Sequence, residues 1–223
     1  WTPVESFSAS GEADWSGCFA DRGERRIGIT HEGVLAETAW QMGGTHNLEN
    51  ALAAVAAAAS AGVSPAQAVD SLSRFDGVKR RMERTATVSD IALYDDFAHH
   101  PTAIGRSIAG LRRRFPNQRL VVALEPRSNT MKMGVHARWL AESLQGADLV
   151  FVNRPEDMDA GFDESLAPLG EKLQLVAGYD ELVNIMASKL APGDQVVFMS
   201  NGGFGAARQK LTMALQKKQT LRV

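Results

Sequence analysis

The sequence predicts an α/β protein in which residues 84–223 form a Rossmann-like, mostly parallel, doubly wound sheet. Short continuous apolar runs, such as Leu120–Leu124 and Gln195–Met199, alternate there with amphipathic helical segments. Such runs are typical of strands that helices bury on both faces. The chain before residue 84 has a different pattern, with short strands and turns followed by two helices. We therefore expect a separate unit over residues 1–83.

In the first unit, short strands are expected between turns that contain Gly, Asp and Glu, as in a meander at a sheet edge. They cover residues 4–8, 26–30 and 33–37. An Ala-rich helix is expected from about residue 46 to 61, with Gly62 as its stop signal. A second helix follows Ser64 as the N-cap and Pro65 as its first residue, and it ends near Phe75.

In the second unit, a hairpin over residues 85–88 and 91–94, turned at Ser89 and Asp90, is expected to supply one antiparallel edge. Strands and helices then alternate to the end of the chain. Strands are expected at 120–124, 149–152, 173–176 and 195–199, and helices at about 102–114, 135–144, 163–169, 180–190 and 205–216.

Composition excludes several classes of protein. The net charge of −2 gives no general attraction to nucleic acid or to an anionic membrane, and we expect neither partner. No apolar run reaches the roughly 18 residues of a membrane helix. The single cysteine, Cys18, has no evident base nearby and predicts a reducing compartment, the cytoplasm. The start at Trp1, without Met or a signal pattern, is interpreted as that of an excised or truncated piece.

Polar segments follow three of the predicted strands. They are residues 95–101 (DDFAHHP), 125–130 (EPRSNT) and 200–205 (SNGGFG). Ligands of open α/β sheets bind at the carboxyl ends of the strands. We therefore expect these segments to converge on a ligand crevice.

Each segment has a functional and a structural interpretation. Either Asp95 or Asp96 caps the next helix, or a carboxylate there accepts hydrogen bonds from a ribose. His99 and His100 are adjacent, which is poor spacing for one metal ion, so a polar substrate contact is the better functional interpretation.

The segments at 125–130 and 200–205 also have both a functional and a structural interpretation. The glycines at 202, 203 and 205 either direct N–H groups at an anion or form a tight turn. Arg127 either binds a carboxylate through its planar fork or is simply solvated.

No phosphate-gripping loop is found in the sequence. Residues 43–45 (GGT) lack the lysine of a Walker motif, and neither GKT nor GKS occurs anywhere. An ATP-hydrolysing site built only from this chain is therefore not expected.

Three motifs in order resemble the Mur ligases, the family that adds amino acids or peptides to UDP-N-acetylmuramate. Residues 44–50 (GTHNLEN) are similar to the family's G-x-H-N-x-x-N, 80–83 (RRME) to its R-[MF]-[ED], and 95–101 (DDFAHHP) to D-D-Y-x-H-H-P. Phe97 departs from the usual Tyr, so that hydroxyl is lost. The segments at 125–132 and 199–204 narrow the resemblance to the branch that recycles murein peptides.

The resemblance implies that residues 1–83 are the end of the central ATP-binding domain and that 84–223 are the C-terminal domain. It places His46, Asn47 and Asn50 near ATP, with the two amides at the adenine edge. It also implies Arg81 as a contact to the phosphates and Asp96 as a contact to the ribose. The residues expected to face the incoming peptide are His99, Arg127, Ser128 and Asn129.

The implied reaction joins a murein tripeptide, L-Ala-γ-D-Glu-meso-diaminopimelate, to UDP-N-acetylmuramate, with ATP and Mg²⁺ as cofactors. The muramate carboxylate attacks the γ-phosphate of ATP, and the peptide amine then attacks the acyl phosphate. The lysine, the main Mg²⁺ ligands and the UDP-binding domain would lie upstream of Trp1, so this chain alone is expected to be inactive. The alternatives are a folylpolyglutamate synthase-like ligase and a non-catalytic nucleotide-binding module.

Overall fold

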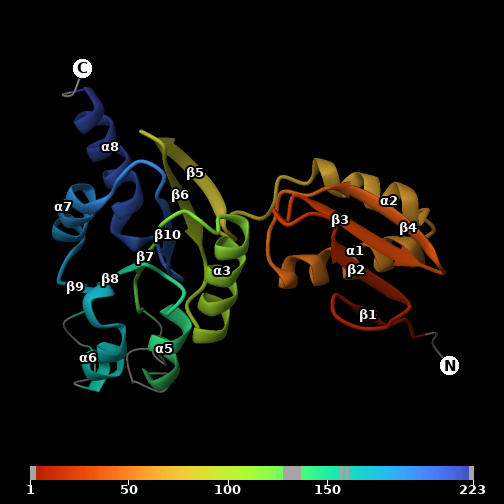
Figure 1. Ribbon diagram of the computed structural model, residues 1–223, viewed down its shortest axis with the longest axis horizontal. Coiled ribbons are helices and arrows are strands. Elements are labelled where there is room, and N and C mark those ends of the chain that lie inside the picture. Colours follow the sequence, from red (N-terminus) through yellow and green to blue (C-terminus); the bar gives the residue numbers. More distant parts are fainter. Residues whose placement is uncertain (1–3, 128–136, 156–157, 159–160, 221–223) are drawn as a thin grey trace. The chain divides into compact units, whose positions relative to one another are not determined.

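The computed structural model describes residues 4–127, 137–155, 158 and 161–220 (Figure 1). The chain divides into two compact units. One comprises Trp1–Gly77 with Ala109–Pro116, and the other comprises Val78–Ile108 with Asn117–Val223. The assignment of residues 1–83 to the end of an ATP-binding domain stays a prediction.

A four-stranded sheet forms the first unit, with the strands in chain order β1 (Phe7–Ser8), β2 (Trp15–Phe19), β3 (Arg26–His31) and β4 (Val34–Ala39). β1 runs parallel to β2, and the other pairs are antiparallel. The predicted strand over 4–8 was too long, since only Phe7 and Ser8 pair. No strand was predicted at β2, which contains Cys18, because Ser, Gly and Cys carry little strand preference and pairing with β3 decides the conformation.

Two helices cover this sheet, α1 (Thr45–Ser60) and α2 (Pro65–Ser71), followed by the 3-10 turn η1 (Leu72–Arg74). The predicted cap of α2 is confirmed, since Ser64 Oγ accepts a hydrogen bond from the Gln67 N–H. Gly17 lets α1 approach the sheet, because a Cβ there would lie 3.1 Å from Leu52 Cδ2. The core of the unit consists of Trp15, Ile27, Ile29, Trp40, Leu48, Ala51, Leu52, Val55, Ala68 and Val69.

A six-stranded sheet forms the second unit, in the order β5-β6-β10-β7-β8-β9. The strands are β5 (Glu83–Val88), β6 (Ile91–Asp96), β7 (Leu120–Leu124), β8 (Leu149–Asn153), β9 (Leu173–Val176) and β10 (Gln195–Met199). All neighbours are parallel except β5, which is antiparallel to β6. The predicted doubly wound sheet with one antiparallel edge is thus confirmed.

Helices lie on both faces of this sheet: α3 (Pro101–Arg114), α5 (Ala137–Leu144), α6 (Gly161–Leu166), α7 (Tyr179–Lys189) and α8 (Ala207–Thr220). The 3-10 turns η2 (Ala167–Lys172) and η3 (Phe204–Ala206) follow α6 and precede α8. Figure 1 shows α7 and α8 on one side of the sheet and α3 on the other. Along β10, Val196 and Phe198 pack into the core beneath α7 and α8, so the alternate residues face the other way.

In the described part of the chain, no helix combines the length and the apolar composition needed to cross a membrane.

Candidate functional site

The three predicted polar segments meet at one edge of the second unit's sheet. β10 lies between β6 and β7, so their carboxyl ends are neighbours. The hydrogen bonding continues one residue beyond the strands: Ser200 N–H donates to the Asp96 carbonyl (3.1 Å), and Glu125 N–H donates to the Met199 carbonyl (3.0 Å). The predicted convergence of the loops that begin at Asp95, Glu125 and Ser200 is therefore confirmed.

A buried acid, Glu125, joins two of these loops. Its side chain accepts the Tyr179 hydroxyl at Oε1 (2.5 Å) and the Ser200 hydroxyl at Oε2, and the residue is 1% exposed. Ser200 Oγ also accepts the Gly202 N–H at 2.8 Å. Both carboxyl oxygens thus have donors, as a buried acid requires.

The surroundings of Tyr179 shift the pKa of its hydroxyl. Burial raises the pKa of its hydroxyl to about 12, and the hydrogen bond and charge of Glu125 act in the same direction. The charge of Arg127 opposes this rise in the pKa of Tyr179. The sequence analysis missed Tyr179 and Glu125 as partners. An acid directly after an all-apolar strand was the available signal for Glu125.

Arg80 links the third loop to β6, although the sequence analysis gave the functional role in this motif to Arg81. Its Nη2 donates to the carbonyls of Ser200 (2.7 Å) and Gly202 (2.5 Å). Its Nε lies 3.6 Å from Asp95 Oδ2, and Asp95 also pairs with Arg208. Arg80 therefore connects the motif at 80–83 to residues 200–205, which we call the glycine segment.

Arg81 is exposed at the surface, with its guanidinium 5.4 Å from the centre of the Phe97 ring. Its contact to ATP phosphates stays a prediction.

Asp96 is buried and engaged by the chain's own donors. Oδ1 accepts the Ala98 N–H (2.6 Å), and Oδ2 accepts the Met82 N–H (3.0 Å) and the Ser107 hydroxyl (3.3 Å). Burial raises the pKa of Asp96 above its usual value, against the effect of these bonds and of the Arg81 charge. None of these three donors is a backbone N–H in the first turn of α3, so they do not show helix capping by Asp96, and the ribose contact stays a prediction.

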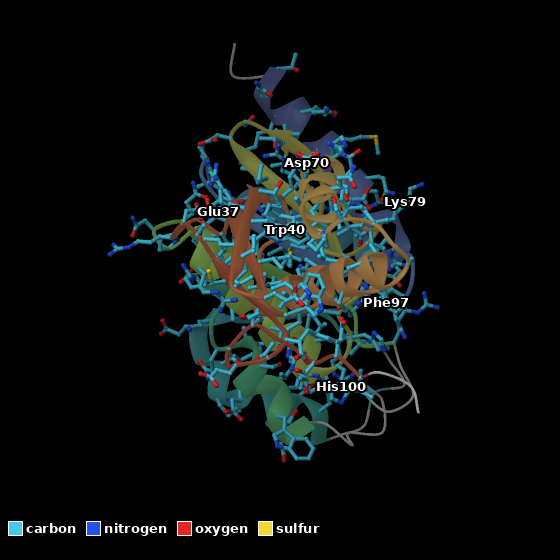
Figure 2. The ribbon with its side chains drawn as sticks, turned by 90° about the vertical axis from the view of Figure 1, so that its right-hand side faces the viewer. Glu37, Trp40, Asp70, Lys79, Phe97 and His100 are labelled. Atoms are coloured by element: carbon cyan, nitrogen blue, oxygen red, sulfur yellow. The ribbon has the colours of Figure 1, made fainter. Side chains whose placement is uncertain are left out.

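The two histidines lie where β6 leads into α3, and Figure 2 marks Phe97 and His100 in this segment. His99 Nδ1 lies 2.8 Å from the Phe97 carbonyl oxygen, and its ring meets Phe97 edge-on. His100 is exposed and accepts the Thr102 N–H at Nδ1 (3.3 Å). Among the described residues, no three His, Cys, Asp or Glu side chains gather as a metal site. The substrate contact of His99 stays a prediction.

Arg127 lies flat against the glycine segment. A Cβ on Gly202 would come within 2.3 Å of Arg127 Nη1 and 2.9 Å of its Cδ, so a larger residue at this position would displace the arginine side chain. Gly205 meets the Tyr179 ring in the same way, with a virtual Cβ 2.3 Å from Cδ2. The side chains of Arg127 and Tyr179 therefore both pack against the backbone of the glycine segment. Ser128 and Asn129, the other predicted peptide contacts, lie outside the described residues.

The predicted ATP contacts of the first unit lie at the start of α1. Asn47 is buried, and its Nδ2 donates to the Gly43 carbonyl at 2.7 Å, which supports the helix start. His46 is half-buried and Asn50 is exposed. The adenine-edge roles stay predictions.

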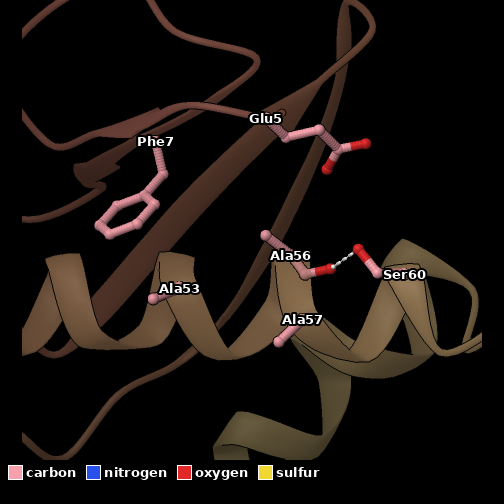
Figure 3. A pocket seen from close by; sticks show the side chains of 6 residues that line it. All are labelled: Glu5, Phe7, Ala53, Ala56, Ala57 and Ser60. Atoms are coloured by element: carbon pink, nitrogen blue, oxygen red, sulfur yellow. Dashed lines mark hydrogen bonds between the residues drawn. The ribbon is translucent and has the colours of Figure 1, made fainter. Parts of the chain in front are cut away.

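A cavity of about 270 Å³ lies in the first unit, between the chain near β1 and one side of α1 (Figure 3). Its polar groups already have partners. Glu5 Oε2 accepts the Trp15 indole N–H (2.7 Å), and the Ser60 hydroxyl donates to the Ala56 carbonyl (3.0 Å). The remaining lining is mostly alanine, so we assign this cavity no chemistry. The candidate site is instead formed by the loops after β6, β7 and β10, which we call the strand-end cluster.

Comparison with known proteins identifies the family. The model of the Mur ligase glutamate ligase domain matches residues 80–202. The chain is 37% identical over 219 residues to the Escherichia coli K12 UDP-N-acetylmuramate–L-alanyl-γ-D-glutamyl-meso-2,6-diaminoheptandioate ligase, covering 98% of this chain and 48% of the relative. It is 40% identical over 192 residues to the Haemophilus influenzae protein of the same name, covering 85% and 42%.

Solved structures agree. A murein peptide ligase from Psychrobacter arcticus 273-4 superimposes with a TM-score of 0.69 at 36% identity, over 97% of this chain and 47% of that one. A UDP-N-acetylmuramate–alanine ligase from Thermotoga maritima shares the fold with a TM-score of 0.79 at 24% identity, over 96% and 48%. The chain spans about half the length of the curated relatives it matches. With the predicted motifs and sheet order in place, the chain belongs to the Mur ligase family.

Proposed function

We propose that this chain forms the peptide-binding half of an ATP-dependent, cytoplasmic ligase of peptidoglycan recycling. The ligase would join L-Ala-γ-D-Glu-meso-diaminopimelate to UDP-N-acetylmuramate, with release of ADP. The support from comparison is the E. coli relative, whose name states this peptide and which is 37% identical over 98% of the chain. Because the chain spans about half of that relative, the activity of the whole protein is part of the proposal.

The observation that carries the proposal is the position of Arg127. It lies at the carboxyl end of β7, beside Gly202 and near Tyr179, and its side chain is exposed. None of the ion pairs found among the described residues occupies its guanidinium. A guanidinium binds a carboxylate through two parallel hydrogen bonds, and the tripeptide carries three carboxylates.

In the proposed reaction, this chain's residues bind and orient while the cofactors supply the activation chemistry. ATP with Mg²⁺ would convert the muramate carboxylate to an acyl phosphate. Arg127, with His99, Ser128 and Asn129, would hold the peptide so that its free amine faces that carbonyl. Arg81 and Asp96, together with His46, Asn47 and Asn50, are proposed for the nucleotide. Among the described residues, no cluster of acids or histidines forms a Mg²⁺ ligand set, so none of them is assigned as a ligand of the ion.

Calorimetric titration of the tripeptide into the chain tests the proposal. We expect saturable binding that Arg127→Ala weakens at least roughly tenfold, because a charged hydrogen-bonded pair is lost. Arg127→Lys should restore only part of it, because a lysine cannot make the two parallel bonds. Arg84→Ala removes an exposed arginine from β5 and is the matched control, with unchanged affinity expected. Equal affinities of Arg127→Ala and the control would refute the assignment.

The same proposal predicts that the chain alone releases no phosphate from ATP, since the sequence contains neither GKT nor GKS. The assay mixes the chain with ATP, Mg²⁺, UDP-N-acetylmuramate and the tripeptide. Sustained tripeptide-dependent phosphate release would contradict this division of labour.

A further inference from the structure

The start of α7 is held in place by the end of β8. Gly178, with φ 104°, is the N-cap residue of α7, and its N–H donates to Asn153 Oδ1 at 3.1 Å. Asn153 is the last residue of β8. The backbone position of Tyr179, the first residue of α7, is therefore fixed at the same edge of the sheet as the strand-end cluster.

From this origin, Tyr179 reaches two segments of the cluster. Its hydroxyl donates to Glu125 Oε1 at 2.5 Å, and its ring lies on Gly205 and edge-on to Phe204, with the ring centroids 6.2 Å apart. Neither contact follows from the Mur ligase motifs in the sequence. Tyr179 thus connects α7, the end of β7 and the glycine segment.

Arg127 and Gly202 are in contact, and each follows a hydrogen-bonded residue by two positions: Arg127 follows Glu125, and Gly202 follows Ser200. Glu125 precedes Pro126 and Arg127, and Ser200 precedes Asn201 and Gly202. The hydrogen bond between Ser200 and Glu125 therefore fixes the separation of the two segments at their origins. Since a single Cβ on Gly202 would collide with Arg127, that separation decides whether the arginine can rest there.

We propose that Tyr179, Glu125 and Ser200 are positioning residues that hold the Arg127 guanidinium over Gly202, ready for a carboxylate of the acceptor peptide. The inference rests on the proposed function for its substrate, and on the geometry alone for the network. Loss of the Tyr179 hydroxyl leaves one oxygen of a buried acid without its donor, which favours turning of Glu125 toward another partner. Arg127 follows Glu125 by two residues and carries the opposite charge. An ion pair between them would leave the guanidinium unable to bind the peptide carboxylate.

Tyr179→Phe in the intact ligase is the direct test, because it removes the hydroxyl and keeps the ring on Gly205. We expect the KM for the tripeptide to rise roughly tenfold, while the KM values for ATP and UDP-N-acetylmuramate stay unchanged. If this variant does not fold, Ser200→Ala removes the other donor and carries the same expectation.

Tyr94→Phe is the matched control. The Tyr94 hydroxyl is also buried and hydrogen-bonded, donating to Gln195 Oε1 at 2.8 Å, but Gln195 is the first residue of β10, at the opposite end of that strand. This control should lose stability without a change in any KM. An unchanged peptide KM in Tyr179→Phe, or a rise that Tyr94→Phe shares, overturns the inference. A wild-type ligase that does not use the tripeptide overturns the proposed function instead.

A second readout needs no ligase activity. The chain has two tyrosines, so in Tyr94→Phe only Tyr179 titrates. Its pKa of about 12 in the folded chain exceeds the usual value of 10, so folding stability should fall as the pH rises between those values. Ultraviolet titration should show phenolate only well above pH 10 for as long as the native circular dichroism signal persists. Adding Glu125→Gln should move ionisation to lower pH, because the charge of Glu125 is gone. Phenolate formation near pH 10 in the native Tyr94→Phe chain would show that the network does not exist.

Discussion

Two neighbouring glycines in the strand-end cluster have different surroundings. A Cβ on Gly202 would meet Arg127, whereas nothing lies within 4 Å of a Cβ on Gly203. Gly203 has φ −85°, a value that alanine adopts easily. The adjacent residues Gly202 and Gly203 therefore offer a matched pair of substitutions.

We predict that Gly202→Ala weakens tripeptide binding by roughly tenfold or more, because Arg127 loses its place, while Gly203→Ala leaves binding within a factor of about two. Calorimetric titration of both variants measures this. The thermal unfolding temperature should change little in either, since the atoms in conflict belong to the far end of a flexible side chain. Equal affinities for both variants would show that the contact between Arg127 and Gly202 has no part in binding.

The sequence allowed part of this cluster to be predicted. Arg127 was identified because it follows an apolar strand, and the glycine segment was identified for the same reason. The Tyr179–Glu125 hydrogen bond was not predictable, because the partners are 54 residues apart and sheet order, which places β10 beside β7, brings them together. For Asp96, the donors Met82 and Ser107 were not predictable, because they lie 14 and 11 residues away in the sequence and approach the carboxylate only in the folded unit.

At the scale of elements, the hairpin of β5 and β6 shows how turn chemistry sets register. Ser89 and Asp90 both have positive φ, 51° and 62°, which matches the two-residue turn that right-twisted strands prefer. Val88 then pairs with Ile91. Neither residue is glycine, so the turn carries backbone strain.

Asp90→Gly should relieve that strain and stabilise the chain by about 0.5 to 1 kcal/mol. Urea unfolding followed by circular dichroism measures the change. The control is Thr87→Gly in β5 itself, which should destabilise by a similar amount, because strand backbone needs no positive φ. Destabilisation by Asp90→Gly would mean that the aspartate contributes more than its backbone conformation shows.

Some elements were predictable and others were not. β7, β9 and β10 have the predicted bounds, because each is a short, mostly apolar run between turn residues. β2 was missed, and only two residues of the predicted strand over 4–8 pair, since strands with little preference of their own depend on their neighbours more than on their composition.

At the scale of the whole molecule, family membership rests on motifs and fold together. Sequence motifs indicated the Mur ligases, and the parallel sheet carries the motif at 95–101 and the segments after β7 and β10 at adjacent strand ends. The proposed nucleotide contacts came from the resemblance of the motifs alone and stay predictions. The assignment of the site therefore depends on the acceptor peptide binding at the ends of β6, β10 and β7.

Two-dimensional amide NMR of the ¹⁵N-labelled chain, titrated with the tripeptide, tests that claim most directly. We predict shifts that saturate and concentrate on the backbone N–H groups after the three strands, with the largest at Arg127, Gly202 and Gly203, and none in the unit containing Trp1–Gly77. Shifts confined to that first unit, or no shifts at saturating peptide, would contradict the account.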